Sequence, residues 1–96
     1  MVKHIVCFKL KDNSPAAKEE AKERLLSIRG KVPVMKDIEV GTDFLGSERS
    51  YDVLLQVTLE NRQALEEYQN DPYHCSYVKP YMHEKRSVSV SVDYEI

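Results

Sequence analysis

The sequence predicts one α+β domain over residues 1–96, with strands and helices in the order β-α-β-β-α-β. Four stretches alternate apolar and polar residues at a period of two, which is typical of strands. Apolar residues recur at helical spacing between the first and second stretches, and again between the third and fourth. This order is that of the ferredoxin-like fold, a four-stranded antiparallel sheet with both helices on one face.

The first predicted strand covers residues 2–11. One of its faces carries Val2, His4, Val6, Phe8 and Leu10, and the other carries Ile5 and Cys7 among lysines. Because both faces are apolar in the middle of the strand, we expect this strand to be covered on two sides. We expect the face that bears His4 to look toward the helices.

The first predicted helix covers residues 15–29. Ser14 suits the N-cap position, because its hydroxyl can accept from a free amide of the first turn, and the fixed φ of Pro15 suits the first helical position. The apolar residues form one stripe on an otherwise charged helix: Ala17, Ala21, Leu25 and Ile28. Gly30 supplies the left-handed residue that ends the helix.

The second and third predicted strands, residues 37–44 and 51–59, form an antiparallel hairpin. Apolar residues and Thr42 alternate with polar ones from Ile38 to Phe44, and the same alternation runs from Tyr51 to Leu59. The polar residues 46–50 between them make a turn of hairpin size.

The remainder of the chain predicts a broken helix and a last strand. The helix begins near Asn61 and carries Leu65 and Tyr68 on one side. Asp71-Pro72 interrupts it, because a proline disfavours helical geometry in the residue before it. One or two helical turns follow over residues 73–81. In residues 88–96, valine, tyrosine and isoleucine alternate with serine and acidic residues, which predicts the final strand.

Composition excludes two classes of partner. The formal net charge is −2 and the pI is about 5.9, and the lysines are scattered among glutamates. Nucleic-acid binding needs a concentrated basic face, so we expect no nucleic-acid partner. The apolar runs are only a few residues long, so we expect no membrane span.

The cysteines and histidines show no metal-binding pattern. Cys7 and Cys75 are far apart and, with the histidines, lack the paired spacing of zinc ligands. We therefore expect no metal, and we identify no residue that would hold haem or another cofactor. We expect both cysteines to be reduced and partly buried. The first five residues run into a strand rather than a signal peptide, so we expect a cytoplasmic protein.

The predicted sheet leaves apolar residues on the face opposite the helices. Ile5 and Cys7 of the first strand and Leu54 of the third lie there. An exposed apolar patch of more than a few hundred Å² usually marks an interface. A two-fold dimer that stacks the two open sheet faces would bury the patch symmetrically.

Four segments, in order and at matching spacing, follow the pattern of a known family. They are VKHIV at 2–6 with Phe8-Lys9, MKDIEVG at 35–41, Tyr68 with Pro72 and His74, and VDY at 92–94. Through these segments, essentially the whole chain resembles the stress-responsive A/B barrel domain of the dimeric α+β barrel superfamily. The resemblance implies the fold described above, with two subunits forming a β-barrel through their sheets. Asp71 departs from the pattern, because the family commonly has histidine before the proline.

The resemblance also implies a candidate site. Most members of the family are stress-associated or uncharacterised proteins, and a few resemble true enzymes, including a cofactor-free polyketide cyclase. The positions that match the active site of that enzyme are His4, Tyr68 and His74. The first predicted helix contains no aromatic residue, so an aromatic-lined substrate pocket is not expected from that helix.

These three residue types suit proton transfer without a metal. Histidine titrates near neutrality and can pass protons in either direction, and a tyrosine hydroxyl can polarise a carbonyl oxygen. The structural alternative is that His4 and Tyr68 pack in the core and that His74 pins the helix break. A shared site requires His4 and His74 to lie within about 10 Å, so that both reach one ligand. We expect His83 to lie in a solvated loop.

Three function classes follow. The first is a homodimeric protein of the resembled family that binds a small molecule between sheet and helices. The second is a cofactor-independent cyclase, lyase or isomerase that uses His4 and His74 as acid and base with Tyr68. The third is a cofactor-free monooxygenase of the same superfamily, for which the sequence offers no distinguishing residue. We favour the first class, because it requires the fewest specific residues.

Overall fold

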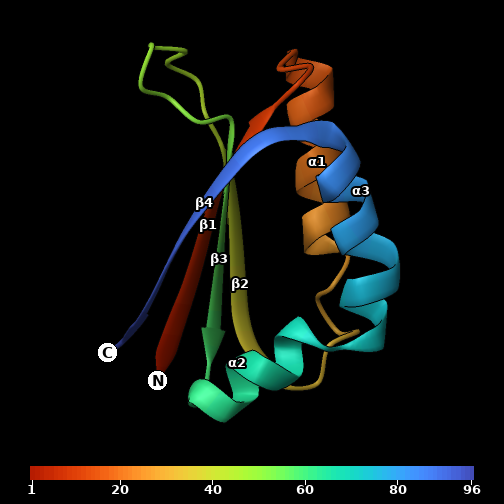
Figure 1. The fold of residues 1–96 in the computed structure, drawn as a ribbon, viewed down its shortest axis with the longest axis vertical. Coiled ribbons are helices and arrows are strands. Elements are labelled where there is room, and N and C mark those ends of the chain that lie inside the picture. Colours follow the sequence, from red (N-terminus) through yellow and green to blue (C-terminus); the bar gives the residue numbers. More distant parts are fainter.

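The computed structural model describes residues 1–96 as a four-stranded antiparallel sheet with helices on one face (Figure 1). The elements are β1 (Val2–Leu10), α1 (Pro15–Leu26), β2 (Met35–Thr42), β3 (Val53–Leu59), α2 (Arg62–Gln69), the π-helix η1 (His74–Val78), α3 (Lys79–Lys85) and β4 (Arg86–Glu95). The strands lie side by side in the order β2-β3-β1-β4. The predicted ferredoxin-like arrangement is confirmed.

β1 lies inside the sheet, hydrogen-bonded antiparallel to β3 on one side and to β4 on the other. This register places His4 opposite Val57 of β3 and opposite Asp93 of β4. The termini lie close together at one end of the sheet (Figure 1), where the Ile96 amide donates to the Met1 carbonyl at 2.9 Å.

α1 begins as predicted but ends at Leu26, before the predicted Arg29. The Ser14 hydroxyl accepts from the Ala17 amide at 3.2 Å, which caps the helix. After Leu26 the chain tightens, because the Arg29 amide donates to the Leu26 carbonyl, three residues back, at 3.0 Å. Gly30, at φ 78°, then turns the chain toward β2, as predicted.

In the hairpin of β2 and β3, β2 begins and ends two residues earlier than predicted, β3 is shorter, and the loop between them is longer. The Asp43 carboxylate accepts from the Gly46 amide at 2.8 Å and turns the chain out of the sheet. Phe44, which was expected on the second strand, therefore lies in the loop with 97% of its surface exposed. β3 begins at Val53 rather than at Tyr51.

α2 and the next helical stretch are separated at Asp71-Pro72, as predicted. The side chain of Asn61 accepts from the Ala64 amide at 2.9 Å and caps α2. The Asp71 carboxylate accepts from the amides of Tyr73 at 2.9 Å and His74 at 3.2 Å. Asp71 therefore starts the second stretch, a role that does not need a histidine at this position.

The second stretch is longer than predicted and begins as a π-helix. In η1 the Lys79 amide donates to the His74 carbonyl, five residues back. Pro80 favours this widening, because its ring has no N–H and crowds the carbonyl four residues before it. α3 continues to Lys85, so His83 lies on a helix rather than in a loop, although it is exposed as expected. None of the helices is long and apolar enough to cross a membrane.

The hydrophobic core lies between the sheet and the helices. The face of β1 that bears His4 looks into it, as predicted, together with the apolar stripe of α1. Tyr68 of α2 and Val78 of η1 are also fully buried there. Of the two free cysteines, Cys7 is half-buried as expected, whereas Cys75 is exposed because it lies on the outer side of η1.

The other face of the sheet carries no helix (Figure 1). It exposes a row of apolar side chains on β4 and beyond its end. The row consists of Val88, Val90, Val92, Tyr94 and Ile96. It continues onto β1 and β3, because Ile5 pairs with Val92, and Cys7 pairs with both Val90 and Leu54. The predicted patch of Ile5, Cys7 and Leu54 is therefore larger than the sequence indicated. We call this whole surface the open face.

Candidate functional site

His4 lies on the helix side of β1 and is held by an acidic residue of the neighbouring strand. Its Nδ1 is hydrogen-bonded to Oδ1 of Asp93, the residue opposite it in the sheet. His4 is buried, whereas 38% of the Asp93 side chain is exposed. A carboxylate on one ring nitrogen fixes the tautomer, so a neutral His4 carries its proton on Nδ1 and offers Nε2 as an acceptor.

Tyr68, in the last turn of α2, packs against both candidate histidines. Its ring centroid is 5.6 Å from that of His4, in an edge-on arrangement, and 4.5 Å from that of His74. The Tyr68 hydroxyl is buried and has no hydrogen-bond partner. Burial raises the pKa of Tyr68, and the nearby charge of Asp71 raises it further. The hydroxyl therefore stays protonated at neutral pH and can act as a donor.

His74 begins η1, where the Asp71 carboxylate holds its amide. The side chain is buried, and its Nδ1 has no partner. Burial lowers the pKa of His74 to about 4; the positive charge of Lys79, and that of His4 when it is protonated, act in the same direction, and Asp71 acts against them. At neutral pH the ring is therefore uncharged, with one nitrogen that donates and one that accepts.

His4 and His74 line one cavity of about 190 Å³ between the sheet and the helices. The other lining residues are Val6, Phe8, Leu25, Leu55, Gln69, Val78, Lys79, Met82, His83, Arg86 and Ser89. Tyr68 contacts both histidine rings but does not itself line the cavity. The structure thus brings the three predicted residues together, and both histidines reach the same small space.

Sequence reasoning missed Asp93 and the basic residues of the cavity. Asp93 follows the serines on one side of the last strand, so an acidic residue in that row was a visible signal. Its partner was not visible, because the register between the first and last strands is set by the whole sheet. Lys79 and Arg86 reach the cavity because α3 runs on from η1 directly into β4. No group of three or more metal-ligating side chains gathers anywhere in the chain.

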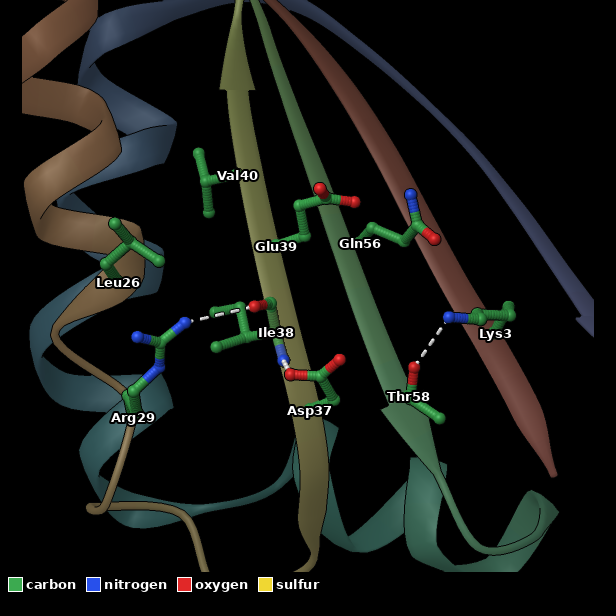
Figure 2. A pocket seen from close by; sticks show the side chains of 9 residues that line it. All are labelled: Lys3, Leu26, Arg29, Asp37, Ile38, Glu39, Val40, Gln56 and Thr58. Carbon is green, nitrogen blue, oxygen red and sulfur yellow. Dashed lines mark hydrogen bonds between the residues drawn. The ribbon is translucent and has the colours of Figure 1, made fainter.

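A larger hollow of about 390 Å³ lies along the edge strand β2 and holds none of the predicted residues (Figure 2). Lys3 donates to Thr58 Oγ1 at 2.8 Å, and Arg29 donates to the Ile38 carbonyl at 3.2 Å. Both hydrogen bonds are drawn in Figure 2. These long side chains are thus already engaged, and no buried unpartnered atom faces this space. The smaller cavity beside His4 is therefore the stronger candidate for chemistry.

Residues 2–96 match the model of the family described as Stress responsive A/B Barrel Domain. The chain belongs to this family. The resemblance found in the four sequence segments is thereby confirmed.

Three proteins of known sequence or structure are similar to this chain. Olivetolic acid cyclase of Cannabis sativa is 30% identical over 79 residues, covering 79% of this chain and 78% of that protein. A dimeric protein of unknown function with a ferredoxin-like fold, from Bacteroides fragilis NCTC 9343, is 29% identical, with a TM-score of 0.83, covering 99% of this chain and 95% of that one. Hydroxynitrile lyase from Passiflora edulis has a TM-score of 0.81 at 18% identity, covering 99% of this chain and 92% of that one. The last likeness shows the fold alone.

Proposed function

We propose that this stress-responsive A/B barrel protein binds a small molecule in the cavity beside His4 and His74, and that it works as a homodimer. The observation that carries the binding proposal is a pair of buried polar atoms without partners, the Tyr68 hydroxyl and Nδ1 of His74. Buried polar atoms are nearly always hydrogen-bonded, and an exception calls for an explanation. A ligand in the cavity would supply the bond that the His74 ring lacks, and an ordered water between the rings would supply the one that the Tyr68 hydroxyl lacks.

The homodimer is supported by the open face. Valines, a tyrosine and an isoleucine stand exposed in a row on a sheet face that no helix covers. A second copy stacked on this face would remove the row from water and form a closed barrel of two sheets. The relative from Bacteroides fragilis is a dimer, which favours the same assembly here. The two free cysteines suit a reducing compartment, so we place the protein in the cytoplasm.

A second candidate function, cofactor-independent proton transfer, is favoured by the pairing of His4 with Asp93. The carboxylate would stabilise the imidazolium that forms when Nε2 of His4 takes a proton from carbon. Neutral His74 would then hold the oxygen of an adjacent carbonyl as it becomes an enolate, and the protonated Tyr68 hydroxyl would support it through an ordered water, because Tyr68 does not line the cavity. These are the parts needed by a cyclase, a lyase or an isomerase. No residue of the site favours a monooxygenase over these.

The binding proposal is tested by titrating the protein with β-ketoacids and phenolic compounds while the histidine ring signals are followed by NMR. We expect the signals of His4 and His74 to shift together and to saturate. His74→Ala should weaken binding at least tenfold, whereas Lys36→Gln, on the distant strand β2, should leave it unchanged. If a compound binds to saturation and neither histidine ring signal shifts, the proposal is contradicted.

The same titration separates the two candidate functions. Binding without conversion of any compound supports a binding protein. Conversion that is lost in His4→Ala and in His74→Ala, with circular dichroism unchanged, supports proton-transfer catalysis.

A further inference from the structure

The cavity beside His4 is positively charged, although the chain as a whole is slightly acidic. The chain contains 16 acidic and 14 basic residues, yet no aspartate or glutamate is among those that line the cavity. Lys79 and Arg86 both line it, together with the exposed ring of His83. A space with cationic walls and no carboxylate attracts an anion.

Arg86 is the cation that lacks a partner. Its guanidinium has no carboxylate within 4.0 Å and no hydrogen bond to any other side chain or to the backbone, although the residue is half-buried. Lys79 differs, because its ammonium donates to the Gln69 carbonyl at 2.6 Å. A planar guanidinium that is partly removed from water and left free is suited to bind a carboxylate through two parallel hydrogen bonds.

The strand register places Arg86 at the end of the cavity away from His4. Arg86 lies opposite Leu10, and Ser89 lies opposite Phe8, whereas His4 lies four residues before Phe8 along β1. Four residues of strand span about 13 Å, and Leu10, the residue opposite Arg86, lies two residues further along β1. The cavity therefore runs along β1, with the histidines toward one end and Arg86 toward the other.

The wall between these two ends is apolar. Val6 and Phe8 of β1 form one side, and Leu25, Val78 and Met82 from the helices form the other. A ligand that satisfied both ends would need an apolar middle, because a polar group placed here would lose its bonds to water without replacement.

We propose that the cavity selects a small monocarboxylate with an apolar body, whose carboxylate binds Arg86 and whose other end carries a carbonyl or hydroxyl group for His4 and His74. This inference rests on the proposed function and specifies its ligand class. One guanidinium matches the two oxygens of a carboxylate. Because the cavity of about 190 Å³ is smaller than the roughly 300–1,000 Å³ of sites for drug-sized ligands, the ligand is small.

The inference is tested with matched pairs of neutral and charged probes. The dissociation constants of 7-oxooctanoate and 3-(4-hydroxyphenyl)propanoate, and of octanoate, which lacks the second polar group, are measured by calorimetry beside those of their primary amides and of octyl phosphate. We expect each carboxylate to bind roughly tenfold to a hundredfold more tightly than its amide, because a hydrogen bond to a charged group is the stronger one. Arg86→Gln should abolish this preference, and Arg86→Lys should keep part of it.

A matched control isolates the cavity. Arg62→Gln removes an arginine that pairs with Glu95 outside the cavity, so it should leave the preference intact. Equal affinity for acids and amides, or an unchanged preference in Arg86→Gln, would overturn the carboxylate assignment while leaving the binding function in place. Tighter binding of the phosphate than of every carboxylate would also overturn it. If neither the acids nor the amides bind, the proposed function fails together with the assignment.

Discussion

His4 and Asp93 stand opposite each other on the adjacent strands β1 and β4, and their side chains are joined by a hydrogen bond at Nδ1 of the histidine. They are 89 residues apart in the chain, so only the pairing of the first and last strands brings them together. This contact orients the one predicted site histidine that lies on the sheet. It links the fold directly to the chemistry of the cavity.

Asp93→Asn should release the ring of His4 while leaving the fold intact. The loss of stability should stay below about 1 kcal/mol, because a partly exposed charge pair contributes little. An amide can donate as well as accept, so it no longer fixes the proton on Nδ1. Nitrogen NMR at pH 8 should show the Nδ1–H tautomer of His4 in the wild type and a mixture in the variant. Glu95→Gln, which changes the carboxylate paired with Arg62, is the control. An identical tautomer ratio in Asp93→Asn would show that Asp93 does not orient His4.

Tyr68→Phe should stabilise the unliganded protein. The hydroxyl is buried without a partner, and removing an unpartnered buried polar group relieves a cost of about 1 kcal/mol or more. Urea unfolding of the ligand-free protein should therefore have a higher midpoint in Tyr68→Phe. Tyr73→Phe is the contrasting control, because the Tyr73 hydroxyl donates to Ser27 Oγ at 3.0 Å and its loss should destabilise. A lower midpoint in Tyr68→Phe would mean that its hydroxyl is bonded in solution.

Stability should fall as the pH is lowered from 6.5 toward 4, because of His74. Its pKa is about 4 in the folded protein and 6.5 in the reference state, so the unfolded chain binds the proton first. The stabilisation is fully present above pH 6.5, is lost as the pH approaches the folded value, and amounts to roughly 1–3 kcal/mol. Urea unfolding at several pH values should show this slope in the wild type and in His83→Gln, whose ring is exposed. The slope should be reduced in His74→Gln, and an equal slope there would refute the assignment to His74.

Val90→Glu should separate the proposed homodimer. Val90 lies in the middle of the open face, so a second copy stacked there would have to bury the new carboxylate. Sedimentation at micromolar concentration should report twice the 11.1 kDa of one chain for the wild type and one chain for the variant. Gln63→Glu, which adds the same charge on the exposed side of α2, should stay dimeric. A wild type that sediments as one chain would rule out the barrel assembly.

The sequence predicted what local patterns determine. Ser14 and Pro15 fixed the start of α1, and the alternation from Val2 to Leu10 identified both the strand and its buried face. The prediction that Phe44 lies on the second strand was wrong. The alternation of apolar and polar residues continues past Asp43, but the side chain of Asp43 turns the chain out of the sheet. A period of two cannot show where pairing stops.

The candidate site was predicted only in part, for a related reason. His4, Tyr68 and His74 were found through their family pattern, and the structure adds that they share one cluster of rings. Asp93 and Arg86 depend on the register of β4 against β1, a non-local property that no short motif encodes. The π-helical turn of η1 was not predicted from the sequence either, although Pro80, which favours it, is present there.

The site beside His4 is tested most directly by locating a bound ligand through intermolecular nuclear Overhauser effects. With any compound that binds, we expect contacts from ligand protons to the rings of both His4 and His74. Contacts confined to Lys3, Thr58 and their neighbours in the hollow along β2 would contradict it.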